Sequence, residues 1–346
     1  MYTNKEIWNV SYPIFLGLLA QNIINVTDTA FLGRVGEVEL GASAMGGLFY
    51  ICVFTIAFGF SVGSQILIAR RNGEGRYKDV GPVMIQGGTF LLGLAVLMFG
   101  LTHLLAPSIV RLLISSDSIF DATMEFLNWR IWGFFFAFVN VMFRALYIGI
   151  TRTKVLTMNA VVMALVNVLL DYILIFGKFG MPEMGIKGAA VASVMAEAAS
   201  LAFFLIYTYA KVDFKKFGLN HWQKIDFSLL GKILSISCFT MIQYFLAMAT
   251  WFVFFIAIER LGQRELAIAN IVRSIYIVML IPVQALSTTT NSLVSNLIGA
   301  GKPEQVMGLC GRMIRICYYF VLPLGILIAL FPELVLRIYT DNLDLI

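Results

Sequence analysis

Charged and titratable residues are scarce in this sequence. Only 13% of the 346 residues are charged, and the chain has two histidines and four cysteines. It contains no Walker A motif, no zinc-ligand spacing and no nucleophile elbow, which are typical of ATPases, zinc proteins and many hydrolases. The cysteines all fall in apolar segments, where they are expected to be small core residues. These absences indicate a protein that is not an enzyme and that uses no cofactor.

Apolar residues are abundant instead. They make up 60% of the chain, and the mean hydropathy is +0.86. The apolar runs are about 20 residues or longer, so they predict membrane-spanning helices and not barrel strands, which alternate over about 10 residues. The sequence therefore predicts an all-α integral membrane protein. Nine spans are expected, at about 8–32, 40–69, 83–105, 122–146, 155–177, 187–209, 229–257, 266–296 and 308–331.

The basic residues follow a loop pattern, so the net charge of +5 does not indicate nucleic-acid binding. The loops after the second, fourth and sixth expected spans carry four, two and five basic residues, and the alternate loops carry one or two each. By the positive-inside rule, this asymmetry predicts a multi-pass protein of the cell (inner) membrane with a cytoplasmic N-terminus.

The chain also contains an internal repeat at an offset of 226 residues. The stretch "VGEVELGASA" (Val35–Ala44) falls on "LGQRELAIAN" (Leu261–Asn270), and "GFSVGSQILIARRNGEGRYKDV" (Gly59–Val80) falls on "ALSTTTNSLVSNLIGAGKPEQV" (Ala285–Val306). The matches include polar loops without a gap, so they indicate duplication and not a chance likeness of apolar helices. Six spans separate equivalent helices, so both halves have the same orientation, as is typical of alternating-access transporters.

The second copy of the repeat is shorter than the first. Residues 1–215 are expected to form an N-lobe of six helices, and residues 216–346 a partial C-lobe of three. Equivalents of the fourth to sixth spans are missing from the second copy. We therefore expect three further spans in the complete protein, which with their loops amount to about 100 further residues.

Two aspartates lie inside expected spans with polar residues at helical spacing. Asn167 and Asp171 are four residues apart and share a helix face, and Gln21 precedes Asp28 by two helical turns. Two carboxylates and amides that face a common cavity could bind a proton, a monovalent cation or a cationic substrate. The alternative is that these groups form ordinary hydrogen bonds between helices. For ionisable residues inside a span, a functional role is the default interpretation.

Two further charged residues lie within or near spans. Glu197, near the middle of the sixth span, is expected to matter less than the aspartates, as a structural hydrogen-bonding group. Arg130 lies close to a span end, where an arginine is expected to extend toward the interface or to pair locally.

At these residues the chain resembles the multidrug and toxic compound extrusion (MATE) transporters. The likeness runs from "IWNVSYPIFLGLLAQNIINVTDTAFLGRVGEVELGASAM" through "NVLLDYILIFGKFGMPEMGIKGAAVAS" to "LSTTTNSLVSNLIGAGKPEQV". The resemblance implies a two-lobed bundle of 6+6 helices, of which about nine are present here, and a monomeric antiporter in the lipid bilayer. It implies export of organic cations or amphiphiles in exchange for H⁺ or Na⁺.

The resemblance also implies roles for individual residues. Asp28 and Asp171 would form the coupling site for a proton, or for Na⁺ together with Asn167, and Gln21 and Ser193 match supporting polar positions. The seventh span, "ISCFTMIQYFLAMATWFVFFIAI", has no acid inside it, which resembles the DinF-like branch of the family. A lipid-linked oligosaccharide flippase of the same superfamily is the alternative function, and a channel or scaffold is a third class that would not need paired acids.

Overall fold

The fold is all-helical in a computed structural model, which describes residues 1–338 without the side chains at 255, 256, 259, 263 and 266. Within this range, nine helices are long and apolar enough to cross a membrane, which confirms the nine expected spans. Most of these helices extend several residues beyond the expected bounds at both ends. The chain is a multi-pass membrane protein.

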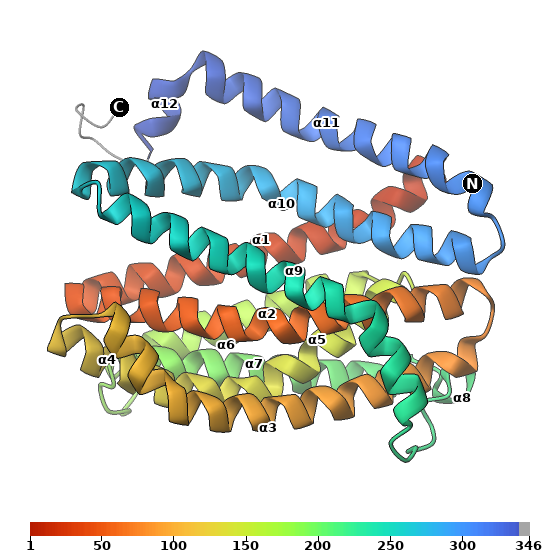
Figure 1. The fold of residues 1–346 in the computed structure, drawn as a ribbon, viewed down its shortest axis with the longest axis horizontal. Coiled ribbons are helices and arrows are strands. Elements are labelled where there is room, and N and C mark those ends of the chain that lie inside the picture. The colour runs from red at the N-terminus through yellow and green to blue at the C-terminus, as the bar shows by residue number, and fades with distance from the viewer. Residues whose placement is uncertain (339–346) are drawn as a thin grey trace.

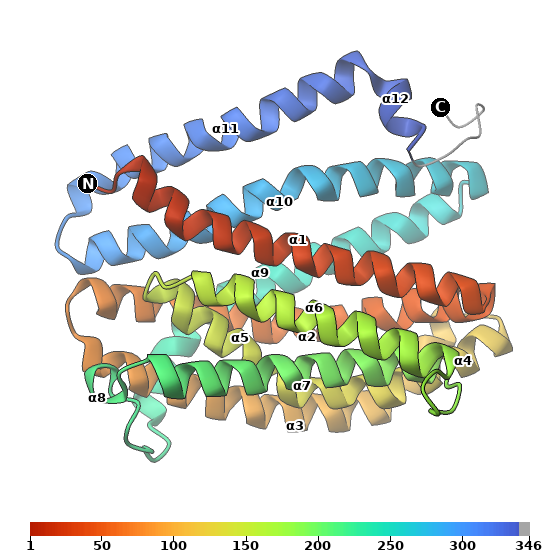
Figure 2. The same cartoon turned by 180° about the vertical axis from the view of Figure 1, so that it is seen from behind.

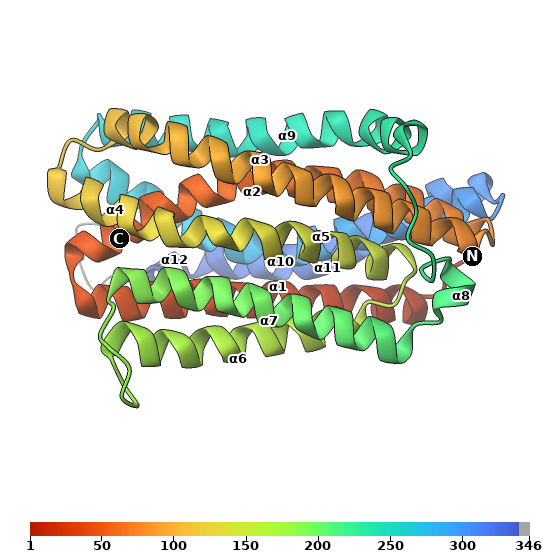
Figure 3. The same cartoon turned by 90° about the horizontal axis from the view of Figure 1, so that it is seen from below.

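The long helices run roughly along one axis of the molecule (Figures 1 and 2). Figure 3 shows α3 and α9 on one side and α1, α6 and α7 on the other, and α1, α6 and α7 pack in that sequence. The elements are α1 (Asn4–Val35), α2 (Glu37–Gly73), η1 (Tyr77–Asp79), α3 (Val80–Leu113), α4 (Asp117–Arg130), η2 (Ile131–Gly133), α5 (Phe134–Gly149), α6 (Lys154–Phe176), α7 (Ile186–Lys211), α8 (Phe214–Phe217), α9 (Phe227–Glu259), α10 (Gln263–Gly299), η3 (Pro303–Gln305), α11 (Val306–Leu330) and α12 (Pro332–Leu336).

The fourth span was expected to be one continuous helix, but the structure shows it interrupted. It consists of α4, a single 3₁₀ turn at η2 and α5. A Cβ on Gly133, in this turn, would collide with the side chains of Glu197 and Arg130. The irregular turn therefore lies where a buried ion pair packs directly against the backbone.

The 226-residue repeat also holds for the element boundaries. Helix α2 (37–73) and helix α10 (263–299) begin and end at positions that are 226 residues apart. The 3₁₀ turns η1 and η3 are related by the same offset. Gly75 and Gly301 both take φ +73°, a left-handed backbone that favours glycine. The duplicated loop sequence thus folds into the same turn twice.

Offset-related residues meet where α2 packs against α10. Gln65 donates to Asn291, its own equivalent, at 3.3 Å. A Cβ on Gly73 would collide with the carbonyl oxygen of Asn296, and one on Gly299 would collide with that of Arg70. Since Arg70 and Asn296 are themselves equivalent, the contact is reciprocal about a local two-fold axis. It brings the two helix ends together at backbone distance.

The same end of the molecule carries the N-terminus and the basic loops. The turns that join α2 to α3 and α10 to α11 lie there with α8 (Figures 1 and 2). Their basic residues include Arg70, Arg71, Arg76, Lys78, Lys215 and Lys216. We call this the basic end of the bundle.

Candidate functional site

Three polar side chains from α1 and α6 converge away from the basic end. Asp28 lies seven residues before the end of α1, and Asp171 lies five residues before the end of α6. The two carboxyl groups lie on either side of one atom of the Asn167 amide, within hydrogen-bond distance of it. With its amide nitrogen turned toward them, Asn167 donates to Asp28 Oδ1 at 2.8 Å and to Asp171 Oδ2 at 3.2 Å. We call these three residues the aspartate cluster.

The aspartate cluster is buried on the α6 side. Asp171 and Asn167 are 0% and 1% exposed, whereas Asp28 is half-buried. Asp171 Oδ1 has no hydrogen-bond partner among the described residues, although it is fully shielded. Two carboxylates this close repel each other when both are ionised, so a proton on one of them, or a cation beside them, relieves the repulsion. The arrangement can therefore hold a proton, or a cation in its place.

The supporting polar residues differ in their distance from the aspartate cluster. The Ser193 hydroxyl is 3.5 Å from the other end of the Asn167 amide, at the limit of a hydrogen bond. Gln21 is exposed and makes no hydrogen bond within the described part of the chain. Thr27 and Thr29 donate to carbonyl oxygens of α1 itself. The geometry thus brings Ser193 to the edge of the cluster but does not bring Gln21 into it.

Glu197 belongs to a second buried group, the ion-pair cluster, which it forms with Arg130 and Tyr50. Arg130 donates to the two carboxylate oxygens of Glu197 at 2.6 and 2.9 Å. The Tyr50 hydroxyl lies 3.1 Å from both oxygens, and its ring lies 3.7 Å from the guanidinium carbon of Arg130. The expectation that Arg130 extends to the interface or pairs locally is wrong, because its partner is 67 residues away on α7.

Tyr50 is the residue of this group that the sequence did not single out. No sequence motif marks this position, and tyrosine is a common core residue. Its ring stacks on Phe134 at 4.9 Å, which fixes the hydroxyl over the carboxylate. Only the packing of α2 against α4 and α5 reveals this role.

Within the described residues, no group of three histidine, cysteine, aspartate or glutamate side chains could hold a metal ion. A Na⁺ ion at the aspartate cluster would instead take two carboxyl groups and the oxygen of an amide. Oxygen ligands of this kind suit hard cations. The donor set therefore accommodates either H⁺ or Na⁺.

Comparison with known proteins gives the family. The MatE family profile matches residues 13–173 and 237–346. Proteins named "Probable multidrug resistance protein NorM" are similar: the one from Thermotoga maritima is 25% identical over 99% of this chain and 73% of its own length. The one from Idiomarina loihiensis is 24% identical over 85% of this chain, and the match spans 64% of its own length.

Solved structures share the fold. An outward-facing MATE family transporter of the MOP superfamily matches with a TM-score of 0.88 and 20% identity, over 98% of this chain and 74% of that chain. A MOP superfamily transporter from Pyrococcus furiosus matches with a TM-score of 0.85 and 20% identity, over 99% of this chain and 75% of that chain. The family consists of transporters and not of enzymes. From the profile match over most of its length, the chain belongs to the MATE (MatE) family of multidrug efflux transporters.

Proposed function

We propose that this protein is an antiporter that exports cationic or amphipathic organic compounds in exchange for H⁺ or Na⁺. The observation that carries the proposal is the aspartate cluster, in which two carboxyl groups from spanning helices face the same Asn167 amide. Ionisable residues inside spans are costly, and they mark ion and proton pathways. The NorM names of similar proteins agree with an efflux function.

The coupling step follows from the charge of the pair. With one proton or none, the aspartate cluster is anionic and attracts an organic cation. An entering proton or Na⁺ neutralises that charge, so the cation is held less tightly and leaves. Each elementary charge that moves inward through a potential of 100 mV contributes about 2.3 kcal/mol. This is sufficient for a tenfold concentration gradient, which costs about 1.4 kcal/mol.

The orientation of the Asn167 amide distinguishes the two coupling ions. If the nitrogen faces Asp28 and Asp171, the amide donates to both and the site holds a proton. If the oxygen faces them, three oxygens converge, as a Na⁺ site needs. Determining the orientation of the Asn167 amide in the presence of each ion would therefore identify the coupling ion.

The placement in the membrane follows the positive-inside rule. The basic end, with the N-terminus, would be cytoplasmic, and the aspartate cluster would then lie in the outer half of the inner membrane. Residues 1–215 would form the N-lobe, and residues 216–346 would belong to the C-lobe. In α9 the single acid is Glu259, at the end of the helix, which supports the DinF-like branch.

The test is transport by the whole protein in vesicles that contain a fluorescent organic cation. We expect an imposed pH or Na⁺ gradient to drive the cation against its own concentration gradient, and an ionophore that collapses the gradient to stop it. Vesicles without protein are the control. Equilibration that ignores both gradients would indicate a channel, and transport of a lipid-linked saccharide alone would indicate a flippase.

A further inference from the structure

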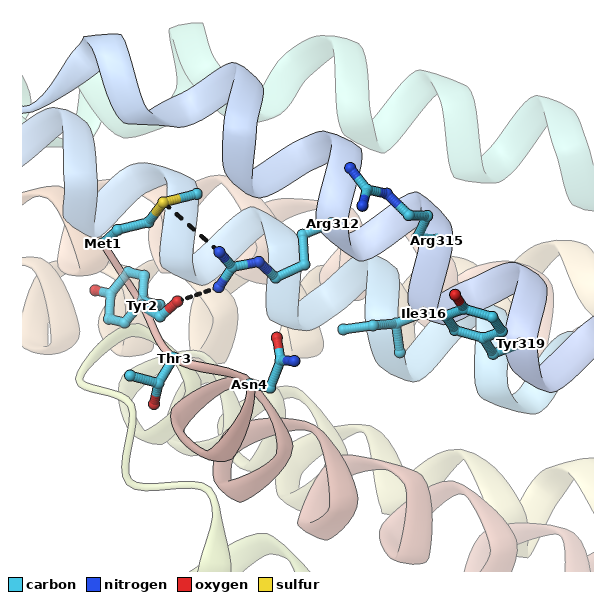
Figure 4. Close-up of a pocket in the computed structure, with 8 residues that line it drawn as sticks. All are labelled: Met1, Tyr2, Thr3, Asn4, Arg312, Arg315, Ile316 and Tyr319. Atoms are coloured by element: carbon cyan, nitrogen blue, oxygen red, sulfur yellow. Dashed lines mark hydrogen bonds between the residues drawn. The ribbon is translucent and has the colours of Figure 1, made fainter.

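Two cavities lie near the basic end, and their linings are related by the repeat. The larger, of about 530 Å³, is lined by residues 1–4 and by Arg312, Arg315, Ile316 and Tyr319 of α11 (Figure 4). The smaller, of about 290 Å³, is lined by α3 and by residues around the start of α9. At the offset of 226, the four α11 residues correspond to Gln86, Thr89, Phe90 and Gly93, and Met1 and Asn4 correspond to Phe227 and Leu230.

The two cavities differ in charge. In the smaller one, Gln86 is saturated by backbone: it donates to the Lys224 carbonyl at 2.8 Å and accepts from the Asp226 N–H at 3.0 Å. The equivalent positions in the larger cavity carry two guanidinium groups, Arg312 and Arg315, on one face of α11. Duplication thus produced one neutral cavity and one cationic cavity from the same framework.

The cationic cavity has donors to spare. Arg312 donates to the Tyr2 carbonyl oxygen and lies 3.6 Å from the Met1 sulfur (Figure 4). These contacts leave other N–H groups of its five free. Arg315 is exposed and makes no hydrogen bond or ion pair within the described residues. Among the described residues that line the cavity, none is acidic, so the two guanidinium groups set its charge.

The surroundings of the cavity are those of a membrane interface. Trp8 of α1 stacks on Phe320 of α11 at 6.1 Å, and its ring is 49% exposed. Tyr319, in the cavity wall, is 73% exposed. Trp8 lies five residues into α1, and an exposed tryptophan near a helix end is typical of the headgroup level. A ligand in this cavity would therefore have its charged part at the arginines and an apolar part along the outside of α11.

We propose that the cationic cavity binds the phosphodiester headgroup of an anionic phospholipid. Guanidinium groups pair with phosphate oxygens through charge-assisted and often bidentate hydrogen bonds. Basic pockets between membrane helices at the cytoplasmic side bind anionic headgroups. Because α1 and α11 both line the cavity, the bound lipid would link these two helices at the end where α2 and α10 meet.

The experiment measures lipid retention by the whole delipidated protein with native mass spectrometry. Phosphatidylglycerol is compared with phosphatidylcholine of the same acyl chains, and with soluble glycerol phosphate. The main variant, Arg312→Gln with Arg315→Thr, installs the residues of the neutral cavity. The variant Arg315→Thr alone keeps the contacts of Arg312 with residues 1 and 2. The matched control, Lys211→Gln with Lys215→Thr, removes the same charge from exposed positions at this end.

We expect the native protein to prefer phosphatidylglycerol. Each arginine removed should weaken that preference about fivefold, whereas the lysine control should leave it unchanged. Retention of the preference by the double arginine variant would overturn the proposal. Equal binding of glycerol phosphate in competition with the lipid would also overturn it, because the ligand would then be a free phosphate compound.

Discussion

The aspartate cluster and the ion-pair cluster are both buried in the first six spans, yet they hold acids in opposite ways. Glu197 faces a guanidinium and a hydroxyl, so its charge is balanced and both of its oxygens are bonded. Asp171 faces another carboxyl group and an amide, and one of its oxygens has no partner in the described part of the chain. Burial of an acid in a membrane bundle therefore does not by itself indicate ion exchange. The groups that face the acid decide whether it can exchange an ion.

The two clusters are nevertheless close. Arg130 lies near enough to Asp28 for its charge to act on that carboxyl group. A change in the ion-pair cluster can therefore reach the aspartate cluster through charge as well as through packing. The following variants separate these two routes.

The largest effect is expected for Asp28→Asn. The amide keeps the shape and the hydrogen-bonding capacity of the side chain but removes its charge and its exchangeable proton. We predict that gradient-driven export falls at least tenfold, to the level of empty vesicles, because the coupling charge is lost. Asp28→Glu should retain part of the activity, since its charge survives at a shifted position. The measurement is efflux from vesicles that contain equal amounts of each protein.

The control for this substitution is Asp121→Asn, which makes the same chemical change at an exposed position of α4. It should export normally. Normal export by Asp28→Asn would mean that Asp28 is only a structural hydrogen-bonding group, and the contrast between the two clusters would lose its functional meaning.

Glu197→Gln should act mainly on stability. It leaves the Arg130 guanidinium buried without its counter-charge, which costs about 3–5 kcal/mol for a broken buried pair. The double variant with Arg130→Gln should recover much of this loss, because no unpaired charge remains. Thermal unfolding in detergent measures the effect, and export is then normalised to folded protein. Loss of normalised export as complete as in Asp28→Asn would show that Glu197 takes part in coupling.

Gly133→Ala should have a smaller effect in the same direction. Its Cβ would collide with the carboxylate of Glu197 and the guanidinium of Arg130, so both groups must move. Overpacking of this kind costs about 1–3 kcal/mol. Gly100→Ala is the control, since a Cβ there meets nothing within 4 Å. Equal unfolding temperatures for the two alanine variants would mean that the ion-pair cluster yields easily.

Ser193→Ala should have the smallest effect. Its hydroxyl is 3.5 Å from the Asn167 amide, too far for a strong bond, so we expect export within about twofold of the native protein. The measurement is export under a pH gradient and, separately, under a Na⁺ gradient. A loss confined to the Na⁺ gradient would place the Ser193 oxygen among the ligands of a bound Na⁺ ion.

The sequence by itself determined the nine spans, because 20-residue apolar runs can only be satisfied in a bilayer as helices. It also determined the equivalence of α2 and α10, because the duplicated loop repeats the same glycines at the same offset. The pairing of Asn167 with Asp171 followed from their spacing on one helix. These features are local, so the residues that specify them are close in sequence or repeat at a fixed interval.

The tertiary structure alone decided which polar groups meet. Only the packing of α1 against α6 brings Asp28 to Asn167 and leaves Gln21 outside, although both lie on α1. Only the packing of α4 against α7 gives Arg130 its partner Glu197. Helical spacing fixes the face that a side chain occupies but not the helix opposite it, because that depends on the shapes of all the interfaces together. For the same physical reason, the sequence could rank Glu197 below Asp28 but could not give the partner of either acid, which only the packed helices supply.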